Sequence, residues 1–165
     1  DVLETILRYD YFWTKIRVQG GAYGAFTQIS RVGTLFFSSY RDPNLKETLD
    51  VFDKTSDYLA SFDVSDREMV KFIIGTISTL DVPLTPQLKG SVAQDRFFRQ
   101  LTDADRQKTR DEILATCQED IRALAAVVDA CMKENILCVF GNEEKLKENA
   151  GLFGSLLHAL GSSTD

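Results

Sequence analysis

Two side chains able to donate hydrogen bonds to an oxygen atom stand at one corner of the chain. Arg17 and Tyr23 are six positions apart and flank the stretch "VQGGA". A guanidinium and a phenol can together hold a carbonyl or an oxyanion. The same residues also have a purely structural interpretation, because a cation complements the dipole at a helix C-terminus and tyrosine is a common strand residue. Spacing alone favours the structural interpretation and leaves the functional one open.

Other catalytic arrangements lack support in the sequence. His158, in "LLHAL", is the only histidine, which excludes HxxEH, HExxH and every other two-histidine zinc site within the chain. We expect His158 to be a packing or surface residue. Neither a GxSxG elbow nor a catalytic cysteine signature accompanies it. The glycines of "GGAYG" follow a predicted helix and precede a predicted strand, the reverse of a dinucleotide-binding loop.

Composition sets the class of protein. The 165 residues carry a formal net charge of −6, with 44% hydrophobic and 27% charged residues, which is typical of a globular chain. This acidic balance argues against a nucleic-acid partner. No apolar run approaches the ~18 residues of a membrane span, so we expect no membrane partner. We predict a single domain over residues 1–165.

The three cysteines predict no metal site and no disulfide framework. Cys117, Cys131 and Cys138 form no CxxC pair, and their number is odd. We expect three buried thiols in a reducing compartment.

The first third of the chain predicts a helix followed by a hairpin. Spacings of four and three place one apolar stripe along the opening helix: Val2, Ile6, Tyr9, Trp13 and Ile16. Asp1 and Glu4 fit a capping box at its start, and Gly20 and Gly21 end it. Residues 22–29 and 34–40 are then predicted to be strands joined by a turn at 30–33.

The remainder is predicted to be mainly helical. Three capping signals mark helix starts, at Asn44 with Glu47, at Ser65 with Glu68, and at Thr102. Pro83 and Pro86 break the chain, and a shorter helical stretch holds Phe97, Phe98 and Leu101. The helix from residue 102 is predicted to run through residue 131. The apolar run "ILCVF" (136–140) is predicted to be a buried strand, Asn142 caps a last helix, and residues 162–165 are expected to fray.

This order of elements predicts an α+β fold, with a small, mainly antiparallel sheet and helices packed on one side. Three strands are few for so many amphipathic helices. We therefore expect a truncated half-domain whose remaining strands belong to polypeptide outside this sequence.

Two blocks of sequence resemble a known family. "LRYDYFWTKIRVQGGAYGAF" and "LFFSSYRDPNLKETLDVFDKTSDYL" are similar to the C-terminal half of presequence-protease-like zinc metallopeptidases of the pitrilysin/insulinase superfamily. The blocks fall within residues 6–60, and the pairing of R-V-x-G-G-A-Y-G with S-Y-R-D-P-N is specific. Later residues are compatible in layout but less diagnostic.

The resemblance implies a function that composition does not reveal. Such enzymes close two bowl-shaped halves around an unfolded peptide, and the N-terminal half carries the HxxEH zinc motif. The resemblance assigns substrate positioning and transition-state stabilisation to Arg17 and Tyr23, and substrate binding to Gly20, Gly21 and Ala22. The zinc ligands would lie outside this chain, which is expected to hold no metal, to be inactive alone and to self-associate. Its expected partners are the peptide substrate and the zinc-binding half.

Two alternatives remain beside this hypothesis. The chain fits an inactive subunit of a two-chain protease, or a non-catalytic peptide-binding or scaffolding module. The resemblance implies a bacterial cytoplasm or an organelle matrix, because related enzymes occur in both.

Overall fold

A computed structural model describes residues 1–30 and 32–157. The chain divides into two compact units, Asp1–Lys133 and the residues from Glu134 onward, and the single domain predicted for residues 1–165 stays a prediction. His158 and residues 162–165 lie outside the described residues. Across the described ranges, every helix is too short or too polar to cross a membrane.

The opening helix changes its winding as it proceeds. It consists of α1 (Val2–Ile6), η1 (Leu7–Tyr11) and η2 (Trp13–Gln19), and the last two are π-helical. A π-helix bonds each N–H five residues back, which widens the turn. Stripe residues spaced by four and three therefore drift off the buried face, and Tyr9 and Trp13 are 60% and 42% exposed. Their predicted burial was wrong.

The start of this helix also differs from the prediction. The side chain of Asp1 makes no capping hydrogen bond. Glu4 instead accepts a hydrogen bond from the backbone N–H of Ile29, at 2.6 Å. Glu4 thus ties the helix to the end of the first strand, and the predicted capping box was wrong.

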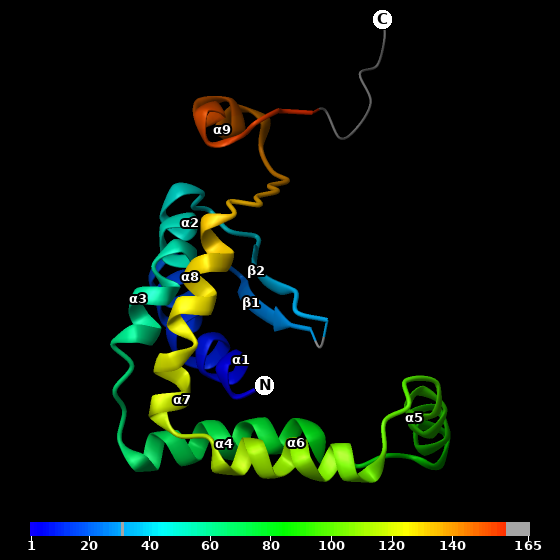
Figure 1. Cartoon of the computed structure of the whole chain (residues 1–165). Helices are drawn as coiled ribbons and strands as arrows, with labels where there is room; N and C mark the ends of the chain where they lie inside the picture. The colour runs from blue at the N-terminus through cyan, green and yellow to red at the C-terminus, as the bar shows by residue number, and fades with distance from the viewer. Residues whose placement is uncertain (31, 158–165) are drawn as a thin grey trace, which may run out of the picture. The chain divides into compact units, whose positions relative to one another are not determined.

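A two-stranded antiparallel hairpin follows (Figure 1). β1 (Gly24–Ile29) pairs with β2 (Leu35–Tyr40), so that Gly24 lies opposite Tyr40. Four residues of one face pack against the hydrophobic core: Ala25, Ile29, Leu35 and Phe37. Three aromatic residues of the other face are exposed: Phe26, Phe36 and Tyr40. The helices therefore cover one side of a small sheet, which confirms the predicted α+β class.

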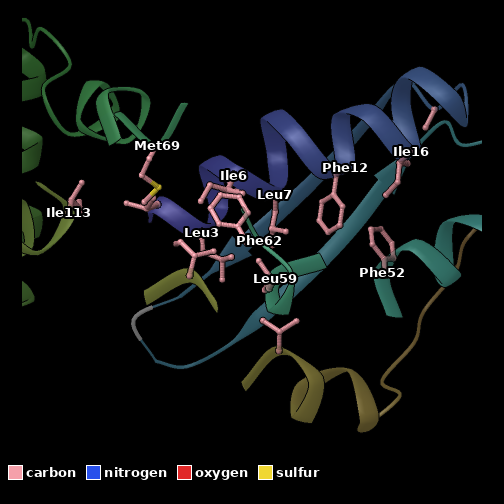
Figure 2. Packing of buried hydrophobic residues seen from close by; sticks show 14 residues of the cluster. Leu3, Ile6, Leu7, Phe12, Ile16, Phe52, Leu59, Phe62, Met69 and Ile113 are labelled. Carbon is pink, nitrogen blue, oxygen red and sulfur yellow. The ribbon is translucent and has the colours of Figure 1, made fainter. Parts of the chain in front are cut away.

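Phe12 lies at the junction of the opening helix, the hairpin and α2 (Lys46–Asp53). Its fully buried ring meets Phe37 and Phe52 edge-on, with centroids 5.0 and 5.3 Å away. Figure 2 shows Phe12 and Ile16 projecting from the same side of the opening helix as Ile6 and Leu7. Val2, Ile6 and Ile16 of the predicted stripe are buried as expected, and Leu7 and Phe12 are buried in place of Tyr9 and Trp13.

Five further helices complete the packing around this core: α3 (Thr55–Ala60), α4 (Asp66–Leu80), α6 (Asp103–Ala115), α7 (Gln118–Ala123) and α8 (Ala125–Lys133). The single helix predicted over residues 102–131 was wrong. Thr116 is extended, and the backbone N–H of Cys117 donates to the carboxylate of Asp120 at 2.9 Å. This local cap restarts the chain as α7, and Leu124 separates α7 from α8.

The capping predictions had different outcomes. Ser65 with Glu68, Thr102 and Asn142 each cap a helix as predicted. The cap predicted at Asn44 was wrong, because α2 begins at Lys46 after an N-cap at Leu45. A further helix, α5 (Pro86–Phe98), begins at Pro86 and is longer than the predicted stretch, which leaves Leu101 outside it.

The second unit contains α9 (Glu143–Glu148) and η3 (Ala150–Leu152). The strand predicted for residues 136–140 was wrong, since this run has no regular structure and Ile136 and Phe140 are 94% and 82% exposed. A strand requires a neighbour for its backbone groups. Within the described part of the chain the sheet contains β1 and β2 alone.

The cysteine prediction was also wrong in one respect. Cys117, Cys131 and Cys138 are free thiols, but all three are exposed. Cys117 precedes α7, where its thiol donates to Asp120 at 3.2 Å. Cys138 lies in the irregular run that was predicted to be a buried strand, so the error there follows from the missing strand.

Candidate functional site

The glycine corner between η2 and β1 is shaped by close backbone contacts. Gly21 has φ +78°, a left-handed conformation that glycine adopts at little cost. Its N–H donates to the carbonyl of Arg17 at 3.0 Å, and the N–H of Ala22 donates to the carbonyl of Ile16 at 3.1 Å. A Cβ atom at Gly20 would lie 2.5 Å from the Ile16 carbonyl oxygen. The helix can therefore end this tightly because Gly20 has no Cβ and Gly21 adopts the left-handed conformation readily.

Two further contacts hold the corner in place. The side-chain amide of Asn44 donates to the carbonyl of Gly20 at 2.5 Å. The N–H of Tyr23 donates to the carbonyl of Tyr40 at 3.1 Å and to that of Arg41 at 3.3 Å. The corner is thus fixed both to the loop before α2 and to the end of the hairpin.

The three residues predicted to bind substrate lie within this corner. The side chain of Ala22 is buried in the core, whereas Gly21 is exposed. The backbone N–H groups of Gly20, Gly21 and Ala22 all donate to carbonyls of the helix. They are consequently engaged inside the protein, and substrate binding by these residues stays a prediction.

A hollow of about 200 Å³ opens beside the corner, in the first unit. Both predicted catalytic residues, Arg17 and Tyr23, line it. The other lining residues come from the opening helix and β1: Arg8, Tyr9, Trp13, Gly24, Ala25 and Phe26. The fold therefore brings a guanidinium and a phenol to one hollow with largely aromatic walls, which we call the Arg17–Tyr23 cavity.

Arg17 rests on an aromatic ring. Its guanidinium carbon lies 4.1 Å from the centre of the Trp13 ring, within the range of a cation–π contact. None of the carboxylates in the described ranges forms an ion pair with it. A guanidinium that stacks through its face leaves the N–H groups of its edge available to an acceptor.

Tyr23 is similarly placed. Tyr23 as a whole residue is 64% exposed, and its ring meets the ring of Tyr40 edge-on, with centroids 6.0 Å apart. The guanidinium of Arg41 lies 6.0 Å from the same ring. Among the residues that the structure describes, none accepts a hydrogen bond from the Tyr23 hydroxyl, so this donor is unengaged.

Comparison with protein families matches residues 1–141 to the family described as "PreP C-terminal domain". The chain belongs to this family. The match covers the opening helix, the glycine corner, the hairpin and the helices of the first unit. The Arg17–Tyr23 cavity therefore lies within the matched part of this PreP C-terminal domain.

Named relatives agree with this assignment. The chain is 44% identical over 155 residues to "Protein HypA" of Clostridium perfringens, which is 94% of this chain and 16% of that protein. It is 37% identical over 137 residues to "Presequence protease 1, chloroplastic/mitochondrial" of Arabidopsis thaliana, and this match covers 82% of this chain and 13% of that protein. It is 32% identical over 120 residues to "Presequence protease, mitochondrial" of Xenopus laevis, and this match covers 73% of this chain and 11% of that protein. The chain thus spans less than a fifth of each relative.

Several cavity residues were not predicted from the sequence of this PreP C-terminal domain. Trp13 was assigned to the core, and Arg8 and Phe26 were not singled out. Trp13 precedes Arg17 by four positions, a spacing that places two helical side chains together, and this signal could have identified the stack. Gly24 has no such signal. A Cβ there would lie 2.8 Å from Cζ of Phe26, so this glycine makes room for the Phe26 ring.

The described residues do not fit a metal. Across residues 1–30 and 32–157 there is no group of three or more His, Cys, Asp or Glu side chains placed to hold an ion. A zinc site in proteins uses three or four such ligands. The Arg17–Tyr23 cavity itself is lined by hydrogen-bond donors, positive charge and aromatic surface.

Proposed function

We propose that this domain is the peptide-binding wall of a zinc metalloendopeptidase that degrades short unfolded peptides. The observation that carries the proposal is that Arg17 and Tyr23 line one hollow with their donor groups unengaged among the described residues. Membership of the PreP C-terminal domain family supports it, as do the relatives named presequence proteases.

In this proposal Arg17 and Tyr23 hold the carbonyl of the peptide bond to be cleaved. The guanidinium edge of Arg17 and the hydroxyl of Tyr23 donate to its oxygen as negative charge develops there. Removing one donor of this kind costs about 3 kcal/mol of transition-state stabilisation. Trp13 fixes the guanidinium by stacking, and the glycine corner fixes the separation between helix and strand.

The zinc ion would be bound by polypeptide outside this sequence, because the described residues offer no ligand set for it. The proposal therefore assigns no metal chemistry to the residues of this chain. We expect no peptide hydrolysis by the 165-residue chain alone. The zinc-binding half is the proposed partner, and an unfolded peptide is the proposed substrate.

The test uses the complete polypeptide that contains this sequence and an unstructured fluorogenic peptide. We expect Tyr23→Phe and Arg17→Ala each to lower kcat/KM by about 100-fold. Tyr40→Phe is the matched control, because it removes a nearby phenol that does not line the cavity, and we expect it to leave kcat/KM near wild type. Unchanged kcat/KM in both test variants would remove the pair from catalysis and favour a non-catalytic peptide-binding module.

A further inference from the structure

Arg41, the residue directly after β2, has an unusual backbone conformation. Its φ of +48° lies in the left-handed region, which costs free energy for most residue types other than glycine. In the described ranges the other non-glycine residues with positive φ are Gln100 and Asn135, which follow the ends of α5 and α8. A left-handed residue is common just past a helix. Arg41 follows a strand, so its conformation has another cause.

Contacts on both sides of Arg41 hold it in this conformation. Before it, the chain is paired into the hairpin up to Tyr40. After it, the carboxylate of Asp42 accepts hydrogen bonds from the N–H of Asn44 at 2.9 Å and from the hydroxyl of the buried Thr48 at 2.7 Å. A residue keeps a costly conformation only where its surroundings fix it, and such residues gather at functional sites.

Main-chain and side-chain contacts join Arg41 to Tyr23. The N–H of Tyr23 donates to the carbonyl of Tyr40 at 3.1 Å and to that of Arg41 at 3.3 Å. The guanidinium carbon of Arg41 lies 5.5 Å from the ring centre of Tyr40 and 6.0 Å from that of Tyr23. Since these two rings also meet edge-on, Tyr40 and Arg41 contact both the backbone and the ring of Tyr23.

The presence of arginine at this position indicates that its side chain has a task. Glycine adopts a positive φ at little cost, as Gly33 does in the hairpin turn, and it would make the same turn without strain. The guanidinium instead supplies a positive charge to the electron-rich faces of two rings, within the range of cation–π attraction. Tyr23 is largely exposed, so packing restrains its ring less than it would restrain a buried one.

We propose that Arg41 is a positioning residue for Tyr23. It holds the Tyr23 ring at the angle from which the hydroxyl donates to the peptide carbonyl, and it does not itself contact the peptide. This inference rests on the proposed function, because Tyr23 has to be the donor that Arg41 positions. Geometry of this kind affects the rate strongly, since a displacement of about 1 Å can cost about 100-fold.

Kinetics of the complete polypeptide with the fluorogenic peptide test the inference. Arg41→Gly removes the guanidinium and keeps the left-handed turn, so its midpoint of urea unfolding should stay near the wild-type value. Arg41→Asn is a second variant with the same expectation, because asparagine also tolerates this conformation. Both should lower kcat about tenfold with little change in KM, because Tyr23 acts on the transition state. Arg41→Lys retains a cation and should keep part of the activity.

A second comparison shows whether the effect passes through Tyr23. In a Tyr23→Phe background the hydroxyl is absent, so Arg41→Gly should cause no further loss of kcat. Arg67→Gln is the matched control for the loss of a positive charge, since Arg67 is an exposed arginine of α4 outside the cavity. It should leave kcat and KM unchanged.

The outcomes separate the two proposals. If Tyr23→Phe lowers kcat but Arg41→Gly and Arg41→Asn do not, the inference is overturned and the proposed function stands. An equal loss with and without the Tyr23 hydroxyl, or a rise in KM alone, would also overturn it, because Arg41 would then act without Tyr23. A large fall in the unfolding midpoint of both variants would show a structural role instead. If Tyr23→Phe leaves kcat/KM unchanged, the proposed role of Tyr23 and this inference both fail.

Discussion

Gly20→Ala tests whether the glycine corner has to be as tight as the structure shows. The new Cβ would lie 2.5 Å from the carbonyl oxygen of Ile16, a backbone atom that cannot rotate away. Overpacking of this kind costs about 1–3 kcal/mol. The shift that relieves it would also weaken the 3.1 Å hydrogen bond from the N–H of Ala22 to that carbonyl, worth about 1 kcal/mol. We therefore expect the free energy of unfolding to fall by about 2–4 kcal/mol.

Urea unfolding followed by circular dichroism measures this loss, with two control variants. Gly90→Ala places its Cβ in open space within α5, where alanine favours the helix, and should raise stability by about 1 kcal/mol. Gly21→Asn introduces a residue type that tolerates φ +78°, and its Cβ would meet only Pro43, at an ordinary van der Waals distance of 3.7 Å. It should cost less than Gly20→Ala. A Gly20→Ala protein within about 0.5 kcal/mol of wild type would refute the reasoning.

Three further predictions concern stability. Phe12→Ala empties a fully buried aromatic site and should cost about 3–5 kcal/mol in urea unfolding, whereas a loss below about 1 kcal/mol would contradict the packing around Phe37 and Phe52. Burial raises the pKa of Tyr58, as does the hydrogen bond that it donates to Asp10 at 2.6 Å. The stability that neutral Tyr58 contributes is full below the ordinary pKa of 10.0 and is lost as pH rises above it. Tyr58→Phe should therefore reduce the fall in the free energy of unfolding at alkaline pH. The same fall in the variant and in wild type would refute this. Hydrogen bonds from Arg110 lower the pKa of Asp81. The stability that ionised Asp81 contributes is therefore full above the ordinary pKa of 3.8 and is lost as pH falls below it. Asp81→Asn should reduce the loss of stability in acid. The same fall in the free energy of unfolding at acidic pH in the variant and in wild type would count against a stabilising Asp81–Arg110 pair.

Features set by neighbouring residues were predictable from the sequence. The caps at Ser65 and Thr102 depend on side chains three positions away, and both form as predicted. The hairpin was predictable for a similar reason, because alternation and a short turn determine it locally. Competing local signals explain one failure: the carboxylate of Asp120 caps a new helix where periodicity alone predicted a continuous one.

Features that depend on distant partners were not predictable. The run at 136–140 has the composition of a buried strand, yet a strand exists only where another strand satisfies its backbone. The π-helical winding of η1 and η2 is not encoded in apolar spacing, and it moves Tyr9 and Trp13 from the expected core to the cavity wall. Arg17 and Tyr23 were identified through family resemblance, and the residues around them emerged only from the structure.

The central claim is that Arg17 and Tyr23 act on the same peptide carbonyl, and a double-mutant cycle tests it most directly. The cycle compares kcat/KM of Arg17→Ala, Tyr23→Phe and the double variant in the complete polypeptide. Donors to one oxygen are coupled, so the double variant should lose less than the sum of the single losses, by about 0.5–3 kcal/mol. Strictly additive losses would contradict the account, because they would mean that the two side chains act independently.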